Sequence, residues 1–124
     1  MGYGNIGKAV EKAAEGLGMN VLVHTRTVRE NGKTKFVGLD TLLENSDIVT
    51  LHCPLNPQSE KMMNAAAFAK MRDGAFFINT SRGGTVDENA LFAALQSGKL
   101  SGAAIDVLTN EPCRPIARLQ TRRI

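Results

Sequence analysis

Gly2-Tyr3-Gly4-Asn5-Ile6-Gly7 decides the fold, because it sets three glycines in the order G-x-G-x-x-G directly before an amphipathic segment. This spacing is typical of a strand-to-helix turn that binds the pyrophosphate of a dinucleotide: glycine permits the tight turn and the close approach of phosphate to backbone amides. The apolar period predicts a helix over residues 6–17, ended by Gly18. The motif taken alone also fits an ordinary glycine turn.

Beyond this helix, short apolar segments alternate with segments of helical period. Strands are predicted over residues 19–25, 36–37, 48–51, 75–79 and 102–107, and helices over 39–45, 64–71 and 88–97. Asn64 and Asp87 are the expected N-caps of the last two helices, and Pro54 and Pro57 place residues 53–59 in a loop. The alternation predicts an α/β fold with a Rossmann-like, doubly wound parallel sheet that helices cover on both faces.

The composition fits one domain of modest size. The 124 residues are 43% hydrophobic and 22% charged, and no apolar run reaches the roughly 20 residues of a membrane span. Met1-Gly2 opens the chain without a basic and apolar leader, so a cytoplasmic protein without a membrane partner is expected. Cys53 and Cys113 are expected to be free thiols, and their spacing to His24 and His52 predicts no metal site.

The excess of positive over negative charge comes from the end of the chain. The formal net charge is +3, but four of the 15 basic residues are arginines within residues 114–124, which leaves eleven against 12 acidic residues before them. A nucleic-acid partner is therefore not expected, because such binding needs basic residues laid out along a folded element. The predicted division is a partial dinucleotide-binding domain over residues 1–113 and a basic tail over residues 114–124.

Three further segments occur in a fixed order after the glycine motif: Leu51-His52-Cys53-Pro54-Leu55, Asn79-Thr80-Ser81-Arg82-Gly83-Gly84, and Ala104-Ile105-Asp106-Val107 through Glu111-Pro112. Together they resemble the NAD(P)-binding domain of the D-isomer-specific 2-hydroxyacid dehydrogenases, closest to the glycerate dehydrogenase or hydroxypyruvate reductase branch. The resemblance implies an oxidoreductase that interconverts a small 2-oxo acid, such as hydroxypyruvate, and a D-2-hydroxy acid. It implies NAD or NADP as cofactor and a homodimeric parent enzyme.

The resemblance also implies a set of site residues. Those expected to bind the cofactor are Gly2, Gly4, Asn5, Ile6 and Gly7 at the pyrophosphate, Thr25 and Arg26 at the adenosine ribose, Cys53, Pro54 and Ser59 along the cleft, and Thr80, Ser81, Arg82 and Asp106 near the nicotinamide. Arg82 and Glu111 are the implied catalytic residues. A guanidinium can bind the substrate carboxylate and stabilise charge developing on the carbonyl, and the glutamate orients a histidine that delivers the proton.

Simpler roles remain open for several of these residues. Arg82 can be a solvated loop residue, Asp106 a turn former or helix cap, and Glu111 an exposed turn residue. We interpret His52 as structural and not as the proton donor, since it ends a strand, and no base is demonstrated that would activate Cys53 as a nucleophile.

Thr25 departs from the family pattern, which usually has Asp at this position to bind the ribose 2′-OH and repel a 2′-phosphate. The pair Thr25-Arg26 lacks that carboxylate and adds a guanidinium. We therefore expect NADPH to be accepted at least as well as NADH.

The second departure is that only Met1 stands where a central first strand is expected. The sequence thus predicts a fragment whose sheet is split between strands 19–25 and 48–51, with exposed edges that favour self-association and with no turnover by the chain alone. Two alternatives to the enzyme stay open: an NAD(H)-sensing binding module similar to corepressors of this fold, and an inert gene fragment.

Overall fold

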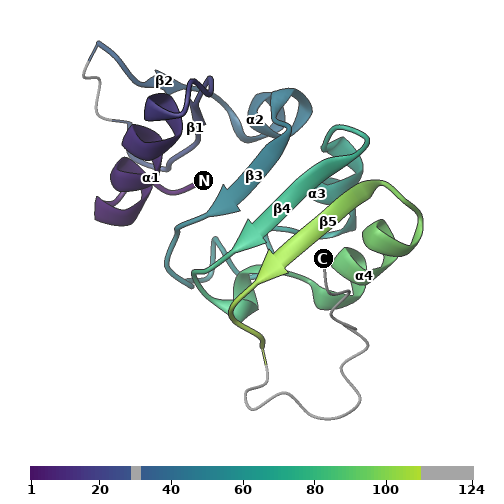
Figure 1. Ribbon diagram of the computed structural model, residues 1–124. Coiled ribbons are helices and arrows are strands. Elements are labelled where there is room, and N and C mark those ends of the chain that lie inside the picture. Colours follow the sequence, from purple (N-terminus) through teal and green to yellow (C-terminus); the bar gives the residue numbers. More distant parts are fainter. Residues whose placement is uncertain (29–31, 110–124) are drawn as a thin grey trace.

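The computed structural model describes residues 1–28 and 32–109 of the chain. All strand pairing among these residues is parallel, in two separate sheets. The first sheet pairs β1 (Leu22–Val23) with β2 (Lys35–Phe36). The second has the order β3-β4-β5, formed by Ile48–Leu51, Ala75–Asn79 and Leu100–Ile105 (Figure 1). The α/β class and the parallel, Rossmann-like arrangement are confirmed.

Helices alternate with these strands in the predicted order. They are α1 (Asn5–Gly16), α2 (Leu39–Asn45), α3 (Ala65–Lys70) and α4 (Glu88–Gln96), with a 3-10 turn, η1 (Gly83–Thr85), before α4. Both predicted N-caps are confirmed: the Asn64 side chain accepts a hydrogen bond from the Ala67 amide at 3.0 Å, and the Asp87 side chain accepts from two amides of the first turn of α4. Gly18 has a φ of 79°, as its predicted place after α1 requires.

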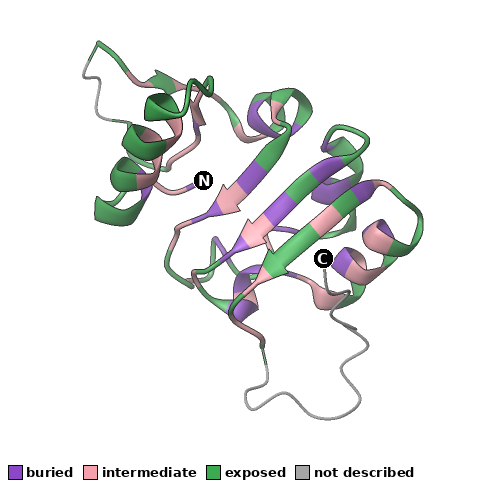
Figure 2. Cartoon of the chain, in the orientation of Figure 1, coloured by how far each residue is buried: buried purple, intermediate pink, exposed green. Residues whose placement is uncertain are grey.

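The hydrophobic core lies between one face of the β3-β4-β5 sheet and the helices α2, α3 and α4 (Figure 2). Phe77 of β4 is fully buried and meets Phe68 of α3 edge to face, with ring centroids 5.3 Å apart. On the opposite face, Ile48 and Phe76 are paired in register and remain 46% and 50% exposed. The expectation that helices cover both faces is wrong for this sheet within the described residues.

Met1 and Gly2 join the two sheets. The Met1 amine donates to the Thr50 carbonyl at 2.7 Å, the His52 amide donates to the Met1 carbonyl at 2.8 Å, and the Gly2 amide donates to the His24 carbonyl at 2.8 Å. Met1 therefore pairs with the edge of β3 and Gly2 with the end of β1. The predicted split of the sheet is observed, and β1 is shorter than the predicted strand over residues 19–25.

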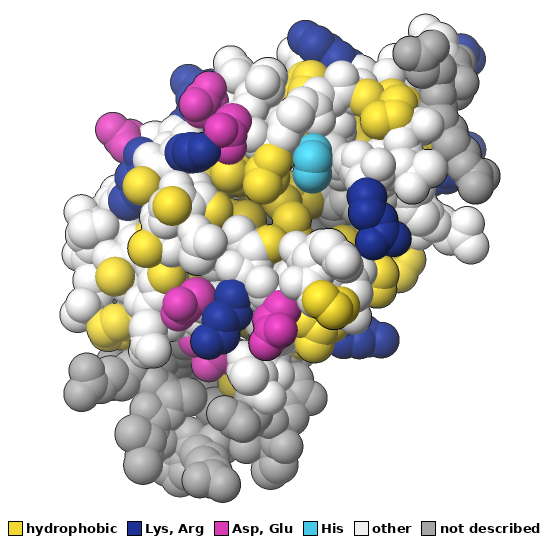
Figure 3. Space-filling model, turned by 180° about the vertical axis from the view of Figure 1, so that it is seen from behind, with side chains coloured by type: hydrophobic (Ala, Val, Ile, Leu, Met, Phe, Trp, Pro, Cys, Tyr) yellow, Lys and Arg dark blue, Asp and Glu magenta, His cyan; other side chains and the backbone are white. Residues whose placement is uncertain are grey.

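The surface mixes charges of both signs. In the view of Figure 3, basic and acidic side chains are interspersed. The ion pairs Lys70–Asp40 and Arg72–Asp47 join exposed groups, and the half-buried Lys99 pairs with the exposed Asp73. Among the residues that the structure describes, none of the helices has the length and apolar character needed to cross a bilayer.

Candidate functional site

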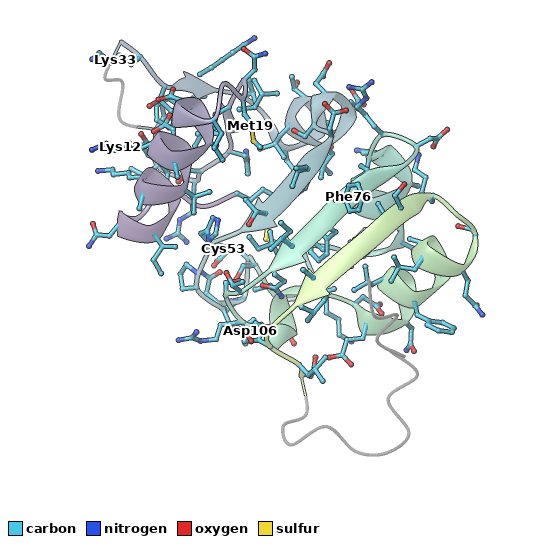
Figure 4. The ribbon with its side chains drawn as sticks, in the orientation of Figure 1. Lys12, Met19, Lys33, Cys53, Phe76 and Asp106 are labelled. Carbon is cyan, nitrogen blue, oxygen red and sulfur yellow. The ribbon has the colours of Figure 1, made fainter. Side chains whose placement is uncertain are left out.

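The carboxyl ends of parallel strands meet at one edge of the molecule, where ligands bind in open α/β sheets. There the glycine turn, the segment after β1 and the segment after β3 enclose a cleft of about 1020 Å³. The predicted site residues in its wall are Gly2, Gly4, Asn5, Thr25, Arg26, Cys53, Pro54 and Ser59. Figure 4 shows Cys53 beyond the end of β3, beside this opening.

The three motif glycines serve three different needs. Gly2 has a φ of 86°, and a Cβ on it would lie 2.8 Å from the backbone of His52 and Cys53. A Cβ on Gly7 would lie 2.3 Å from the Gly2 carbonyl oxygen, so this glycine lets α1 pack against the turn. A Cβ on Gly4 would meet nothing within 4 Å, and its φ of −82° suits any residue. Neither backbone strain nor packing in the protein therefore requires glycine at position 4.

The N-terminus of α1 opens at the same place. Gly4 is its N-cap, no side chain caps the helix, and the first turn holds no acidic residue. The leading amides of a helix have no partner within it, and they stand at the positive end of the helix dipole. Together with the open space beside Gly4, this arrangement fits the pyrophosphate of a dinucleotide, which needs amide donors and close backbone approach.

Thr25 and Arg26 form the wall of the cleft that follows β1, where Arg26 is exposed and Thr25 is half-buried. Tyr3, Lys8 and Thr27 line the cleft as well. The position after the second strand of the motif is the one that meets the adenosine ribose. This wall thus presents hydroxyl groups and cationic side chains and, among the described lining residues, no carboxylate.

The loop after β3 forms the remaining wall and is held by its own side chains. The buried Ser59 hydroxyl donates to the Pro54 carbonyl at 2.6 Å, and the Asn56 carboxamide oxygen accepts from the amides of Gln58 and Ser59, both at 3.0 Å. Burial raises the pKa of the Cys53 thiol and lowers that of His52, whose Nε2 lies 3.1 Å from the Thr50 hydroxyl. Both side chains are therefore held in their neutral forms near pH 7.

The turn that carries Arg82 is organised by Asn79, the last residue of β4. The Asn79 side chain is fully buried; its Nδ2 donates to the Arg82 carbonyl at 3.0 Å, and its Oδ1 accepts from the Ser81 amide at 3.0 Å and the Ser81 hydroxyl at 2.8 Å. The Arg82 side chain is exposed, and its Nη1 donates to the Ser81 carbonyl at 2.7 Å. The backbone of the turn is thus fixed while the guanidinium stays at the surface.

Six of the predicted residues that the structure describes lie outside the wall of the cleft: Ile6, Gly7, Thr80, Ser81, Arg82 and Asp106. The last four follow β4 and β5 at the same edge of the sheet, and the Asp106 amide donates to the Asn79 carbonyl at 3.0 Å (Figure 4). Gly7 is buried under the turn instead of facing the cleft. Glu111 lies outside the described residues.

Sequence reasoning missed several residues of the cleft. Tyr3 and Lys8 occupy variable positions of the glycine motif and of the helix after it, so the motif gives no signal for them. Asn56, Gln58 and Met62 line the cleft from the loop after β3 and the residues beyond it. Their polar and apolar types are unremarkable in a loop, and only the folding of this segment against the glycine turn brings them to the site.

Comparison with known proteins agrees with this geometry. The chain is 44% identical over 117 residues to a hydroxypyruvate reductase from Blautia hydrogenotrophica. The aligned region covers 92% of this chain and 36% of that protein. It superposes with a TM-score of 0.89, at 36% identity, on an NADPH-dependent glyoxylate/hydroxypyruvate reductase from Sinorhizobium meliloti in complex with NADP and malonate, covering 94% of this chain and 37% of that one. A D-lactate dehydrogenase from Aquifex aeolicus, complexed with NAD and lactic acid, matches with a TM-score of 0.84 at 38% identity, over 88% of this chain and 34% of that one.

The chain thus spans little more than a third of the length of these relatives. Residues 1–123 match the family model described as the D-isomer specific 2-hydroxyacid dehydrogenase, NAD binding domain. The uncapped helix, the three glycines and the order of the strand ends are the features by which such a domain holds its dinucleotide. The chain belongs to the D-isomer specific 2-hydroxyacid dehydrogenases, as a member of the family of their NAD-binding domains.

Proposed function

We propose that this chain is the dinucleotide-binding part of an oxidoreductase that interconverts a small 2-oxo acid and a D-2-hydroxy acid. The observation that carries the proposal is the open space beside Gly4 at the uncapped N-terminus of α1. No contact within the described protein fills that space, and it lies in the wall of the cleft. The family match supports this enzymatic function over that of a cofactor-sensing corepressor.

The residues of the chain divide the work. The amides of the glycine turn and of the first turn of α1 bind the pyrophosphate, and the loop over residues 53–59 closes the far wall. When bound, the dinucleotide supplies or accepts the hydride. The protein positions the cofactor and the substrate and supplies the electrostatic environment. The residues that do so follow β1, β3, β4 and β5, which end at one edge because the strands are parallel.

Arg82 is the residue we assign to the substrate. Its backbone is fixed by the buried Asn79 side chain, while its guanidinium is exposed beyond the end of β4. A planar guanidinium can pair with the carboxylate of a 2-oxo acid through two hydrogen bonds and stabilise negative charge that develops on the carbonyl oxygen. Thr80, Ser81 and Asp106 stand at the same edge, where the nicotinamide is expected.

Thr25 and Arg26 set the choice of cofactor in this proposal. A 2′-phosphate on the adenosine ribose meets a hydroxyl and a guanidinium in this wall instead of a repelling carboxylate. The chain therefore binds NADPH at least as tightly as NADH. A charge-assisted hydrogen bond contributes about 1.5–3 kcal/mol, so loss of the guanidinium weakens NADPH binding about tenfold or more.

Titration of the purified chain with NADPH and with NADH tests the proposal. Nicotinamide fluorescence is the readout, since the sequence contains no Trp that can report binding. We expect saturable binding of both, with Arg26→Ala weakening NADPH alone. Arg72→Ala is the matched control, because Arg72 pairs with Asp47 on the surface away from the cleft. Absence of binding to either dinucleotide contradicts the proposed site, and equal weakening of both by Arg26→Ala contradicts the role of Arg26.

A further inference from the structure

Tyr3 stands between the first two glycines of the turn, and its phenol reaches two other elements. The hydroxyl donates a hydrogen bond to Glu11 Oε2, in the second turn of α1. The same oxygen lies 2.8 Å from Oγ1 of Thr34, the residue directly before β2. A phenol has one proton, and in the first bond it points to the Glu11 carboxylate. The Thr34 hydroxyl is therefore the donor in the second bond.

The ring of Tyr3 is also held by two contacts. It meets Phe36 of β2 edge to face, with centroids 5.3 Å apart at an angle of 89°. The Lys8 ammonium of α1 lies 5.6 Å from the ring centroid on the cleft side of the helix, within range of a cation–π contact. Ring and hydroxyl thus tie the glycine turn to both α1 and β2.

The link continues from β2 to the wall that holds Thr25 and Arg26. β2 pairs with β1 in parallel register, and the Val37 amide donates to the Val23 carbonyl at 2.9 Å. His24, the residue directly before Thr25, has its Nδ1 3.2 Å from the Val37 carbonyl oxygen. Each step is a direct contact, so the phenol of Tyr3 adds a side-chain link between the glycine turn and the Thr25–Arg26 wall, beside the backbone bond from the Gly2 amide to the His24 carbonyl.

We propose that Tyr3 is a positioning residue that, together with the backbone bond from Gly2 to His24, sets the distance between the glycine turn and the Thr25–Arg26 wall, and thereby the preference for a dinucleotide that carries a 2′-phosphate. This inference rests on the proposed function, since it concerns the same cleft. A ligand held at its pyrophosphate and at its 2′-phosphate needs both anchors at a fixed separation, whereas one without the 2′-phosphate needs mainly the first. Loss of the Tyr3 hydroxyl should therefore weaken NADPH binding more than NADH binding.

The test compares dissociation constants for NADPH and NADH in one substitution that removes the hydroxyl with both its hydrogen bonds and in others that change one of its partners. Tyr3→Phe keeps the ring against Phe36 and removes the oxygen, and Thr34→Val removes the second hydroxyl at nearly constant volume. Thr34→Ser restores a donor and should rescue the preference. Glu11→Gln replaces the carboxylate that accepts from the phenol by a neutral amide, and Glu15→Gln is its matched control, because Glu15 lies further along the same helix, away from the phenol.

We expect Tyr3→Phe and Thr34→Val to raise the dissociation constant for NADPH about tenfold and that for NADH less than threefold. In the absence of cofactor, amide hydrogen exchange at residues 25–27 should become faster in Tyr3→Phe. Equal weakening of both dinucleotides, or unchanged binding and exchange, overturns the positioning role. Binding of neither dinucleotide by the unaltered chain overturns the proposed function and the positioning role with it, and this outcome is distinct because it needs no substitution.

Discussion

Replacement of Asn79 by alanine should lower the free energy of unfolding by about 2–3 kcal/mol. The fully buried carboxamide makes three hydrogen bonds of 2.8–3.0 Å to the turn that carries Arg82, two with Ser81 and one with the Arg82 carbonyl. Each contributes about 1 kcal/mol net. The Arg82 carbonyl also accepts from the Thr85 hydroxyl at 2.6 Å, so the amide and the hydroxyl of Ser81 are the groups that lose their partner.

Asn79→Asp sharpens this prediction. The carboxylate cannot donate to the Arg82 carbonyl, and at neutral pH it is a buried charge that faces a carbonyl oxygen. Its destabilisation should exceed that of Asn79→Ala at pH 7 and become smaller at acid pH, where protonation restores a donor.

Urea unfolding followed by far-ultraviolet circular dichroism measures both variants, since no Trp is present. Asn45→Ala is the matched control, because the Asn45 side chain makes an exposed bond to the Thr41 carbonyl at 2.8 Å and should cost less than about 0.5 kcal/mol. A loss at Asn79→Ala as small as that at Asn45→Ala would show that the carboxamide does not hold the turn, and the reasoning would be wrong.

Gly4→Ala should leave the melting temperature unchanged, because an added Cβ meets no protein atom within 4 Å. Dinucleotide binding, measured by nicotinamide fluorescence, should weaken at least tenfold, because the methyl group takes the space of the ligand. Tight binding by this variant would contradict the proposed pyrophosphate site. Phe77→Ala should cost about 3–5 kcal/mol in urea unfolding, since Phe77 is fully buried against Phe68, whereas the half-exposed Phe76→Ala should cost less than half as much. Burial lowers the pKa of the Met1 amine from 8.0 to about 6. The unfolded chain therefore binds more protons between pH 6 and 8, and stability should rise by about 2–3 kcal/mol as the pH increases across that window. N-terminal acetylation should abolish this slope, and a slope that survives acetylation belongs to another group.

The helices were predictable because their signals are local. Asn64, Asp87 and Gly18 each act on the backbone within three residues, so the sequence predicts the ends of α3, α4 and α1 well. Strand limits depend on partners that the sequence does not show. The predicted strand over residues 19–25 is paired only at Leu22–Val23, and β5 begins two residues before the predicted start of its strand.

The site was predictable where a motif fixes the backbone and not where side chains meet across elements. Glycine spacing located the turn of Gly2 and Gly4, and the family pattern located the loop around Cys53. Tyr3 contacts Glu11, eight residues away in α1, and Thr34, 31 residues away before β2, and no local pattern encodes those contacts. The residue roles proposed at β4 and β5, and at Glu111 outside the described residues, stay predictions.

The junction at Met1 and Gly2 bears on how the molecule unfolds. In the described part of the chain, the backbone hydrogen bonds between the sheets run through these two residues, while the core around Phe77 lies mainly on the β3-β4-β5 side, with Leu22 and Val37 packed against it only partly buried. The glycine turn with β1 and β2 can therefore open as a separate cooperative unit of low stability. A dinucleotide that touches the turn and the loop over residues 53–59 bridges both units, so its binding would merge two unfolding transitions into one.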